Sequence, residues 1–370
     1  MTSTTATSSA RAGLLAELPT LADCIARPYD NFSLLRLILA LAVVVSHAFS
    51  VSTGGHEPLY LSTGFSLGEY AVNGFFTISG FLVTMSFARR GWRDYIVART
   101  LRIAPAFIVA TLAMALFGSL ITTLSVADYW RDPQVGRFIV ATLTTFKSAG
   151  ALPGVFADNP LRAPLGTVWT LKYEVLCYLG VFVFGVAVGL SRRGIALAIV
   201  AGLGITIVLL DVLYPEAGKA VQTSLRLPFL FGIGAIFFLY RDEVRITSWI
   251  VLMLVAATWL AQDTAFYKAL SFATGAYGII WLAVAPGLSS RAFDLKTDLS
   301  YGVYLLGWPV QQTLQAFSPH MPIEAMLPIA VVLSLLVALV SWHAVEKPAL
   351  GLKARILNHA RRREPRPSAT

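Results

Sequence analysis

The chain has 370 residues, of which 56% are hydrophobic and 13% are charged, and its mean hydropathy is +0.69. Soluble globular domains carry about 25% charged residues, so this composition excludes that class and predicts a polytopic membrane protein. Long apolar runs between short polar connections fit helices of roughly 20 residues, and they lack the alternating pattern of an outer-membrane barrel. The predicted fold is therefore an all-α transmembrane helical bundle.

A net charge of +9 accompanies these apolar runs. Most of the basic residues lie just beyond the ends of the runs, where topology determinants occur, so we expect no nucleic-acid partner. The two cysteines, Cys24 and Cys177, stand far apart without other metal-ligand residues nearby. Neither a disulfide framework nor a metal site is predicted.

Three regions follow in chain order. Residues 1–30 contain no apolar core long enough for a signal peptide and are predicted to form a partly disordered cytoplasmic segment. Residues 31–350 form the membrane domain, and residues 351–370 a basic cytoplasmic tail.

Lys and Arg concentrate in the connections on the side of the N-terminus, which predicts both termini in the cytoplasm. About ten spans are predicted, at 31–52, 69–88, 104–124, 167–190, 194–213, 222–240, 246–262, 266–285, 298–317 and 325–345.

Two connections contain further helical patterns. The longest, 125–166, includes VGRFIVATLTTF, which predicts an amphipathic helix at the outer membrane face. The segment 89–105, RRGWRDYIVARTLRIAP, alternates arginines with apolar residues and predicts an interfacial helix on the inner side.

The first span combines an arginine and a histidine in the run LRLILALAVVVSHAF. Eleven residues of α-helix make about three turns and rise about 16 Å, so Arg36 and His47 share one face. An ionisable group as deep as His47 favours a chemical role over a structural hydrogen bond. Arg36 alone is equally compatible with an interfacial anchor.

The fourth span contains the segment TVWTLKYEVLCYL. Counted inward from the outer surface, Glu174 falls at about the depth of His47 and could orient its imidazole. Lys172 is an equally good partner for this carboxylate, so both interpretations stay open.

Two further groups of residues lie in the inner connection and the ninth span. Arg99 and Arg102, three residues apart, face similarly on a helix and could hold anionic lipid headgroups or the phosphates of a soluble cofactor. The ninth span carries a polar and aromatic stripe at Ser300, Tyr301, Tyr304 and Trp308, a pattern more often due to helix packing than to a site.

Together these segments resemble the membrane-bound acyltransferase family 3, whose members acylate bacterial glycans. The resemblance covers about residues 30–350 and rests on five motifs in order: Arg36 with His47, NGFFTISGFL at 73–82, RTLR at 99–102, WTLKYE at 169–174 and SYGVYLLGWP at 300–309. One position departs from the pattern, since Gly307 stands where the last motif has a histidine.

The resemblance implies transfer of an acyl group, most often acetyl, from cytoplasmic acyl-CoA to a glycan hydroxyl, in the cytoplasmic membrane of a bacterium. Acyl-CoA would be the donor substrate, with no tightly bound cofactor, and the implied partners are the glycan acceptor, membrane lipid and polysaccharide biosynthesis proteins. His47 would act as general base, with Glu174 and Ser79 assisting. Donor binding is implied for Arg36, Arg99 and Arg102, and acceptor binding for Trp169, Tyr301, Tyr304 and Trp308.

Two other classes of protein fit part of the pattern. A secondary transporter also places His, Arg and Glu in its spans, but the two halves of this chain show no hydropathy symmetry. A non-catalytic membrane subunit of a polysaccharide export machine would not need a histidine at that depth.

Overall fold

The computed structural model describes residues 18–147 and 150–362, and most of this part of the chain is helical. Its only β-pairing within those ranges is an isolated bridge between Thr20 and Arg245. Each of the ten predicted apolar segments coincides with helix, as the apolar runs and short polar connections require. The all-α prediction is confirmed.

The described residues form two compact units. The first comprises the chain up to Arg36 together with Asn73–Met85 and Ala187–Lys296, and the second comprises Leu37–Val72, Ser86–Val186 and the chain from Thr297 onward. The first unit contains α2 (Leu21–Ile25), α9 (Arg193–Leu213), α10 (Lys219–Leu239), α11 (Ser248–Leu260), α12 (Tyr267–Val284) and the short helix η1 (Arg291–Phe293).

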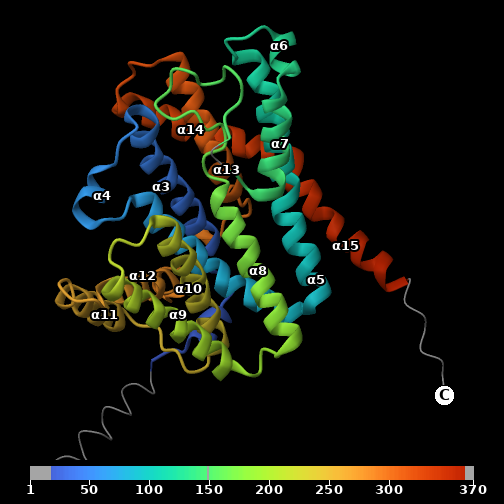
Figure 1. Cartoon of the computed structure of the whole chain (residues 1–370). Coiled ribbons are helices and arrows are strands. Elements are labelled where there is room, and N and C mark those ends of the chain that lie inside the picture. The colour runs from blue at the N-terminus through green and yellow to red at the C-terminus, as the bar shows by residue number, and fades with distance from the viewer. Residues whose placement is uncertain (1–17, 148–149, 363–370) are drawn as a thin grey trace, which may run out of the picture. The chain divides into compact units, whose positions relative to one another are not determined.

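Figure 1 labels α3 (Phe32–Thr53) and α5 (Leu67–Ile121), which have residues in both units. The remaining helices belong to the second unit, apart from the last residue of α8 (Trp169–Ala187). These are α4 (Pro58–Thr63), α6 (Val126–Arg131), α7 (Pro133–Thr145), α8, α13 (Ser300–Phe317), α14 (Ile323–Ser341), the π-helical turn η2 (Trp342–Glu346) and α15 (Lys347–Arg362).

Six helical segments in the described part of the chain are long and apolar enough to cross a membrane. They are α3, α5, α8, α9, α10 and the continuous segment Ile323–Asn358. The protein is therefore a multi-pass membrane protein.

The helix predicted over 89–105 is present from Trp92 onward, but it is continuous with the following span, and its interfacial position stays a prediction. The helical path breaks at Gly91, which has φ 76° and ψ 173°, and from Trp92 it continues through Pro105 to Ile121. Glycine tolerates this positive φ, whereas Pro105 only removes one backbone hydrogen bond inside the helix. Arg99 and Arg102 consequently lie within a long helix. The segment around Ser79 is likewise part of α5.

The first unit contains a close helix crossing made by two glycines. A Cβ atom added at Gly80 of α5 would overlap the carbonyl oxygen of Phe231, and one added at Gly234 of α10 would overlap the carbonyl oxygen of Thr77. Small residues at such crossings let two backbones approach closely, which is the main source of helix association in lipid. The motif glycine at position 80 is thus explained by packing.

Gly80→Ala is therefore expected to lower stability by about 1–3 kcal/mol, because the new methyl group must separate two backbones. Gly202→Ala in α9 is the matched control, since nothing lies within 4 Å of a Cβ at that position. Thermal unfolding of the purified variants in detergent would measure the difference. Equal melting temperatures for the two variants would contradict the close crossing.

In the second unit, the connection between α5 and α8 is folded onto α5. The hydroxyl of Tyr129 in α6 donates to the carbonyl of Ala115 at 2.7 Å, and burial raises the pKa of Tyr129 to about 12, so that it stays a neutral donor. The predicted amphipathic helix within this connection is confirmed as α7, whose N-terminus is capped by Asp132. Residues 122–147 and 150–168 of the connection therefore belong to the folded part of the unit.

Candidate active site

His47 lies on α3 and is half-buried in the second unit. Its ring meets the ring of Trp308 of α13 edge to face, with centroids 4.9 Å apart and an interplanar angle of 87°. Among the described residues no hydrogen bond reaches the imidazole. Both ring nitrogens are therefore available to a substrate, while the indole restricts the orientation of the ring.

Trp308 is itself held by the connection that leads into α8. Its indole Nε1 donates to the carbonyl of Ala163 at 2.7 Å. A Cβ atom added at Gly166 would overlap the indole ring, so the backbone there passes directly over it. These contacts determine where the ring that faces His47 lies.

A cluster of buried amides on α13 extends this arrangement. Gln311 donates to the carbonyl of Val44 in α3 at 2.6 Å, and Gln312 donates to the carbonyl of Leu161 at 2.8 Å. Asn159 donates to the side-chain oxygen of Gln312 at 2.6 Å. The cluster joins the helix that carries His47 to the connection that holds Trp308. The sequence analysis missed these residues, although three glutamines in an otherwise apolar helix, VQQTLQ, were the available signal.

Gly307 has a packing role in this chain. A Cβ atom at this position would lie 2.7 Å from Cγ2 of Val44 and 3.5 Å from Oγ of Ser334. The space for a side chain at position 307 is therefore taken by α3 and α14, and a histidine would not fit without moving them.

Glu174 makes its hydrogen bond within α8. Its carboxylate accepts from the hydroxyl of Tyr178, one helical turn away. Lys172 instead places its ammonium 4.8 Å from the ring centroid of Tyr173. Within the described ranges, Glu174 has no hydrogen bond to His47 and no ion pair with Lys172. Any influence of Glu174 on His47 is therefore indirect.

The two tyrosines of the α13 stripe use their hydroxyls inside the protein. Tyr301 donates to the carbonyl of Ile103 at 3.0 Å, and the hydroxyl of Tyr304 lies 2.5 Å from Oγ1 of Thr170. With Trp308 they form a line of polar and aromatic groups along α13, one helical turn apart. This line leads from α5 to His47.

Arg102 is bound at the start of this line. Its guanidinium lies 2.7 Å from a carboxylate oxygen of Asp298 and 3.5 Å from one of Glu346. The side chain of Arg102 is 13% exposed, that of Asp298 21% and that of Glu346 3%. Glu346 ends the π-helical turn η2, a rare conformation that aims its side chain back into the unit. Arg102 therefore joins α5, the start of α13 and the end of α14.

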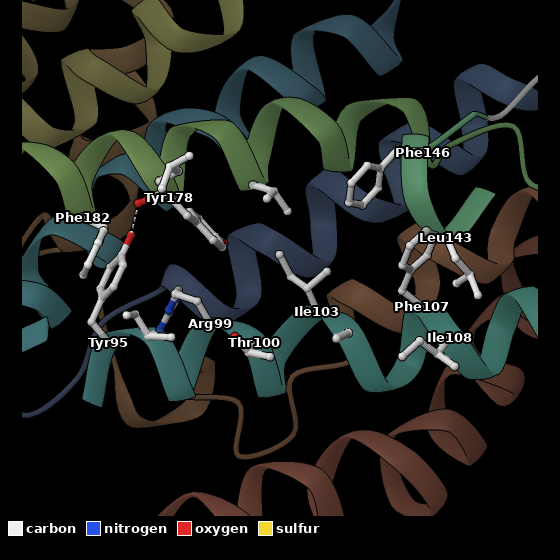
Figure 2. Close-up of a pocket in the computed structure, with 14 residues that line it drawn as sticks. Tyr95, Arg99, Thr100, Ile103, Phe107, Ile108, Leu143, Phe146, Tyr178 and Phe182 are labelled. Atoms are coloured by element: carbon white, nitrogen blue, oxygen red, sulfur yellow. Dashed lines mark hydrogen bonds between the residues drawn. The ribbon is translucent and has the colours of Figure 1, made fainter. Parts of the chain in front are cut away.

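Arg99, one turn before Arg102, has different surroundings. Its guanidinium lies 5.7 Å from the ring centroid of Tyr178, and in the described part of the chain no carboxylate lies within ion-pair distance of it. It lines a cavity of about 570 Å³ between α5 and α8. Figure 2 shows Arg99 rising from α5 towards Tyr178, while Phe107 and Phe146 close the far end.

Three further predicted site residues are not among the contacts given so far. Arg36 and Ser79 belong to the first unit. Arg36 is half-buried near the start of α3, and Ser79 is half-buried one residue before the α5 and α10 crossing. Trp169 begins α8 and is 38% exposed. Their roles stay predictions from the resemblance.

The structure is that of a multi-pass membrane protein with a half-buried histidine that makes no hydrogen bond within residues 18–147 and 150–362, and comparison with known proteins identifies its family. The acyltransferase domain matches residues 29–344, which is most of the chain. The chain therefore belongs to the acyltransferase family and is a membrane acyltransferase, as the five motifs indicated.

Two curated relatives extend this finding. The O-acetyl transferase of Shigella phage Sf6 is 27% identical over 326 residues, covering 85% of this chain and 94% of that protein. Nodulation protein 10 of Rhizobium leguminosarum bv. viciae is 28% identical over 360 residues, covering 89% of this chain and 95% of that protein. No solved structure matches the chain.

The amide cluster on α13 leads to a test of how His47 is held. Gln312→Leu removes the bonds to Leu161 and Asn159 and is expected to lower kcat for acyl transfer about tenfold, because the connection that holds Trp308 loosens. KM for the donor should change less, since no donor contact is removed. Thr313→Val is the matched control, because the hydroxyl of Thr313 bonds only within its own helix, to Pro309. Equal kcat values in the two variants would contradict the positioning role.

Proposed function

We propose that the protein transfers an acyl group, most often acetyl, from cytoplasmic acyl-CoA to a hydroxyl of a glycan outside or within the membrane. The family and the relative named an O-acetyl transferase support the reaction class. The observation that carries the assignment to this site is His47, an imidazole without a hydrogen bond among the described residues, oriented by Trp308.

His47 acts as the general base. A neutral imidazole nitrogen accepts the proton of the acceptor hydroxyl while the hydroxyl oxygen attacks the thioester carbonyl. The carbon–sulfur bond then breaks, and the CoA thiolate leaves and takes up a proton. Glu174 has no hydrogen bond to His47 in the part of the chain that the structure describes, so in this proposal it holds Tyr178 and the adjoining part of α8 in place.

The line of side chains along α13 suggests the route between donor and acceptor. With the N-terminus in the cytoplasm, Arg102 and Tyr301 lie towards the inner side and Trp308 towards the outer side. Seven residues of α13 separate Tyr301 from Trp308, a rise of about 10 Å. The acyl end of the donor enters from the inner side, and the acceptor reaches His47 from the outer side, so that CoA does not cross the membrane.

Of the three arginines predicted to bind the donor, Arg102 is already bound by Asp298 and Glu346. A donor phosphate would have to displace these carboxylates, so we assign Arg102 a structural role. Arg36 remains the predicted donor contact from the resemblance.

The assignment is tested in two parts. Purified protein in liposomes, given labelled acetyl-CoA and an acceptor glycan, is expected to transfer the label. Surface glycans of a deletion strain are expected to lack an acyl group that the parent strain carries, and mass spectrometry identifies its mass and position. Glycans that are identical in the two strains, with no transfer in liposomes, would overturn the proposal.

A further inference from the structure

The cavity beside Arg99 has no role in the acyl transfer described above. Its walls come from α5, α7 and α8 of the second unit, and its lining consists mainly of aliphatic and aromatic side chains. Arg99 is the only charged residue among them. A cavity of this size with one cation at one end favours an amphiphilic ligand with an anionic group.

The cation is not neutralised by the protein around it. Asp298 and Glu346 bind Arg102, Glu174 accepts from the hydroxyl of Tyr178, and no ion pair joins Arg99 to a carboxylate in the part of the chain that the structure describes. The Nε atom of Arg99 is buried and has no hydrogen-bond partner in the described part of the chain. A half-buried guanidinium with a buried, unpaired Nε is stabilised by an anion, and a phosphate offers oxygens that accept from it in pairs.

The cavity also opens to the side of the helix bundle. Ile96 and Ile108 of α5 and Leu179 of α8 line it and are 39%, 43% and 53% exposed. On a membrane protein such an apolar face meets hydrocarbon, so a ligand can enter directly from the bilayer. Figure 2 shows the apolar side chains of Ile103, Phe107 and Leu143 continuing from Arg99 along α5 and α7.

A water-soluble donor fits this lining less well than a lipid does. A pantetheine arm carries two amides that need hydrogen-bond partners, and the cavity's two tyrosine hydroxyls already donate elsewhere, that of Tyr95 to the carbonyl of Tyr178 at 2.8 Å and that of Tyr178 to Glu174. Hydrocarbon chains need no such partners.

The position of Arg99 distinguishes two kinds of lipid. Arg99 lies one helical turn before Arg102 in α5, and the guanidinium of Arg102 packs against the ring of Tyr301. Tyr301 lies about 10 Å along α13 from Trp308, whose ring contacts His47. A lipid-linked acceptor held by its phosphate at Arg99 would place that phosphate roughly 15 Å from the proposed base. The site is therefore better suited to a bulk membrane lipid than to the acceptor.

We propose that the cavity between α5 and α8 binds one anionic glycerophospholipid, with its phosphate on Arg99 and an acyl chain along Ile103, Phe107 and Leu143. Basic pockets between transmembrane helices commonly bind anionic lipids in this manner. The bound lipid fills the gap between the two helices and neutralises Arg99. This inference does not depend on the proposed acyl transfer.

The test uses the full chain in nanodiscs of phosphatidylcholine that contain a minor fraction of phosphatidylglycerol. Native mass spectrometry of the released protein is expected to show one retained phosphatidylglycerol in preference to phosphatidylcholine. Arg99→Gln should lower that retention about tenfold, because a charge-assisted contact is lost. Ile108→Trp should lower it by filling the cavity, and Leu143→Trp serves as a second cavity-filling variant if the first does not fold.

Two controls separate the site from general surface attraction. Arg93→Gln removes an exposed arginine of the same helix that does not line the cavity, and Val109→Trp places the same bulk on the neighbouring residue outside it. Both should retain the lipid.

Three results would overturn the proposal. The first is equal retention of phosphatidylglycerol and phosphatidylcholine. The second is unchanged retention of phosphatidylglycerol in Arg99→Gln and in the cavity-filling variants. The third is unchanged retention in Arg99→Gln together with a raised KM for acyl-CoA. The last result would assign Arg99 to the donor. Because lipid retention needs no acceptor or donor, a failure of the acyl-transfer assay leaves this measurement interpretable.

Discussion

His47→Ala is expected to reduce acyl transfer by about 10² to 10⁴-fold, the usual contribution of a positioned general base. The imidazole makes no hydrogen bond in the described part of the chain, so its removal leaves no protein group without a partner. Stability should therefore change little relative to activity. Initial rates with labelled acetyl-CoA in liposomes, together with the melting temperature of each variant, would measure both effects.

His343→Ala is the matched control for this experiment. That imidazole is exposed, lies in η2 and hydrogen-bonds the carbonyl of Leu339 in the preceding helix α14, at 2.9 Å. The control should keep the wild-type rate. Transfer that survives undiminished in His47→Ala would remove His47 from the mechanism while leaving the family assignment intact.

Arg102→Ala is expected to lower the free energy of unfolding by about 3–5 kcal/mol, because it leaves two buried carboxylates without their cation. Glu346 is only 3% exposed and Asp298 21% exposed, so water compensates little for the loss. The measurement is thermal or denaturant unfolding of the purified variant in detergent. Addition of Asp298→Asn and Glu346→Gln should restore part of the stability, since the uncompensated charges are then removed.

Arg99→Ala is the natural comparison, three residues away on the same helix. Its guanidinium has a ring contact but no carboxylate partner among the residues that the structure describes, so in lipid-free detergent its loss should cost far less than that of Arg102. Equal destabilisation by the two substitutions would contradict the different surroundings that the structure assigns to them. The distinction also matters for kinetics, because a fall in the activity of Arg102→Ala would reflect a loss of folded protein and would not by itself indicate weaker donor binding.

The sequence motifs and the structure differ in what they say about these arginines. Spacing placed Arg99 and Arg102 on similar faces of a helix, which is correct, but it could not show that Asp298 and Glu346 bind only one of them. Those partners lie 196 and 244 residues away along the chain. The same limit applies to Glu174. Its predicted depth in the membrane suggested His47 as its partner, whereas in the structure its carboxylate accepts a hydrogen bond from Tyr178 of the same helix.

The class of protein was readable from local properties of the chain. Hydropathy over windows of span length, the positions of Lys and Arg, and five short motifs are each set by neighbouring residues, and they predicted a helical membrane acyltransferase. Tertiary structure alone decided which side chains meet. The contact of His47 with Trp308, the buried amide cluster of α13, the ion pairs of Arg102 and the cavity beside Arg99 all join segments far apart in sequence. Such contacts depend on the packing of several helices at once, and no periodicity within one helix specifies its neighbours.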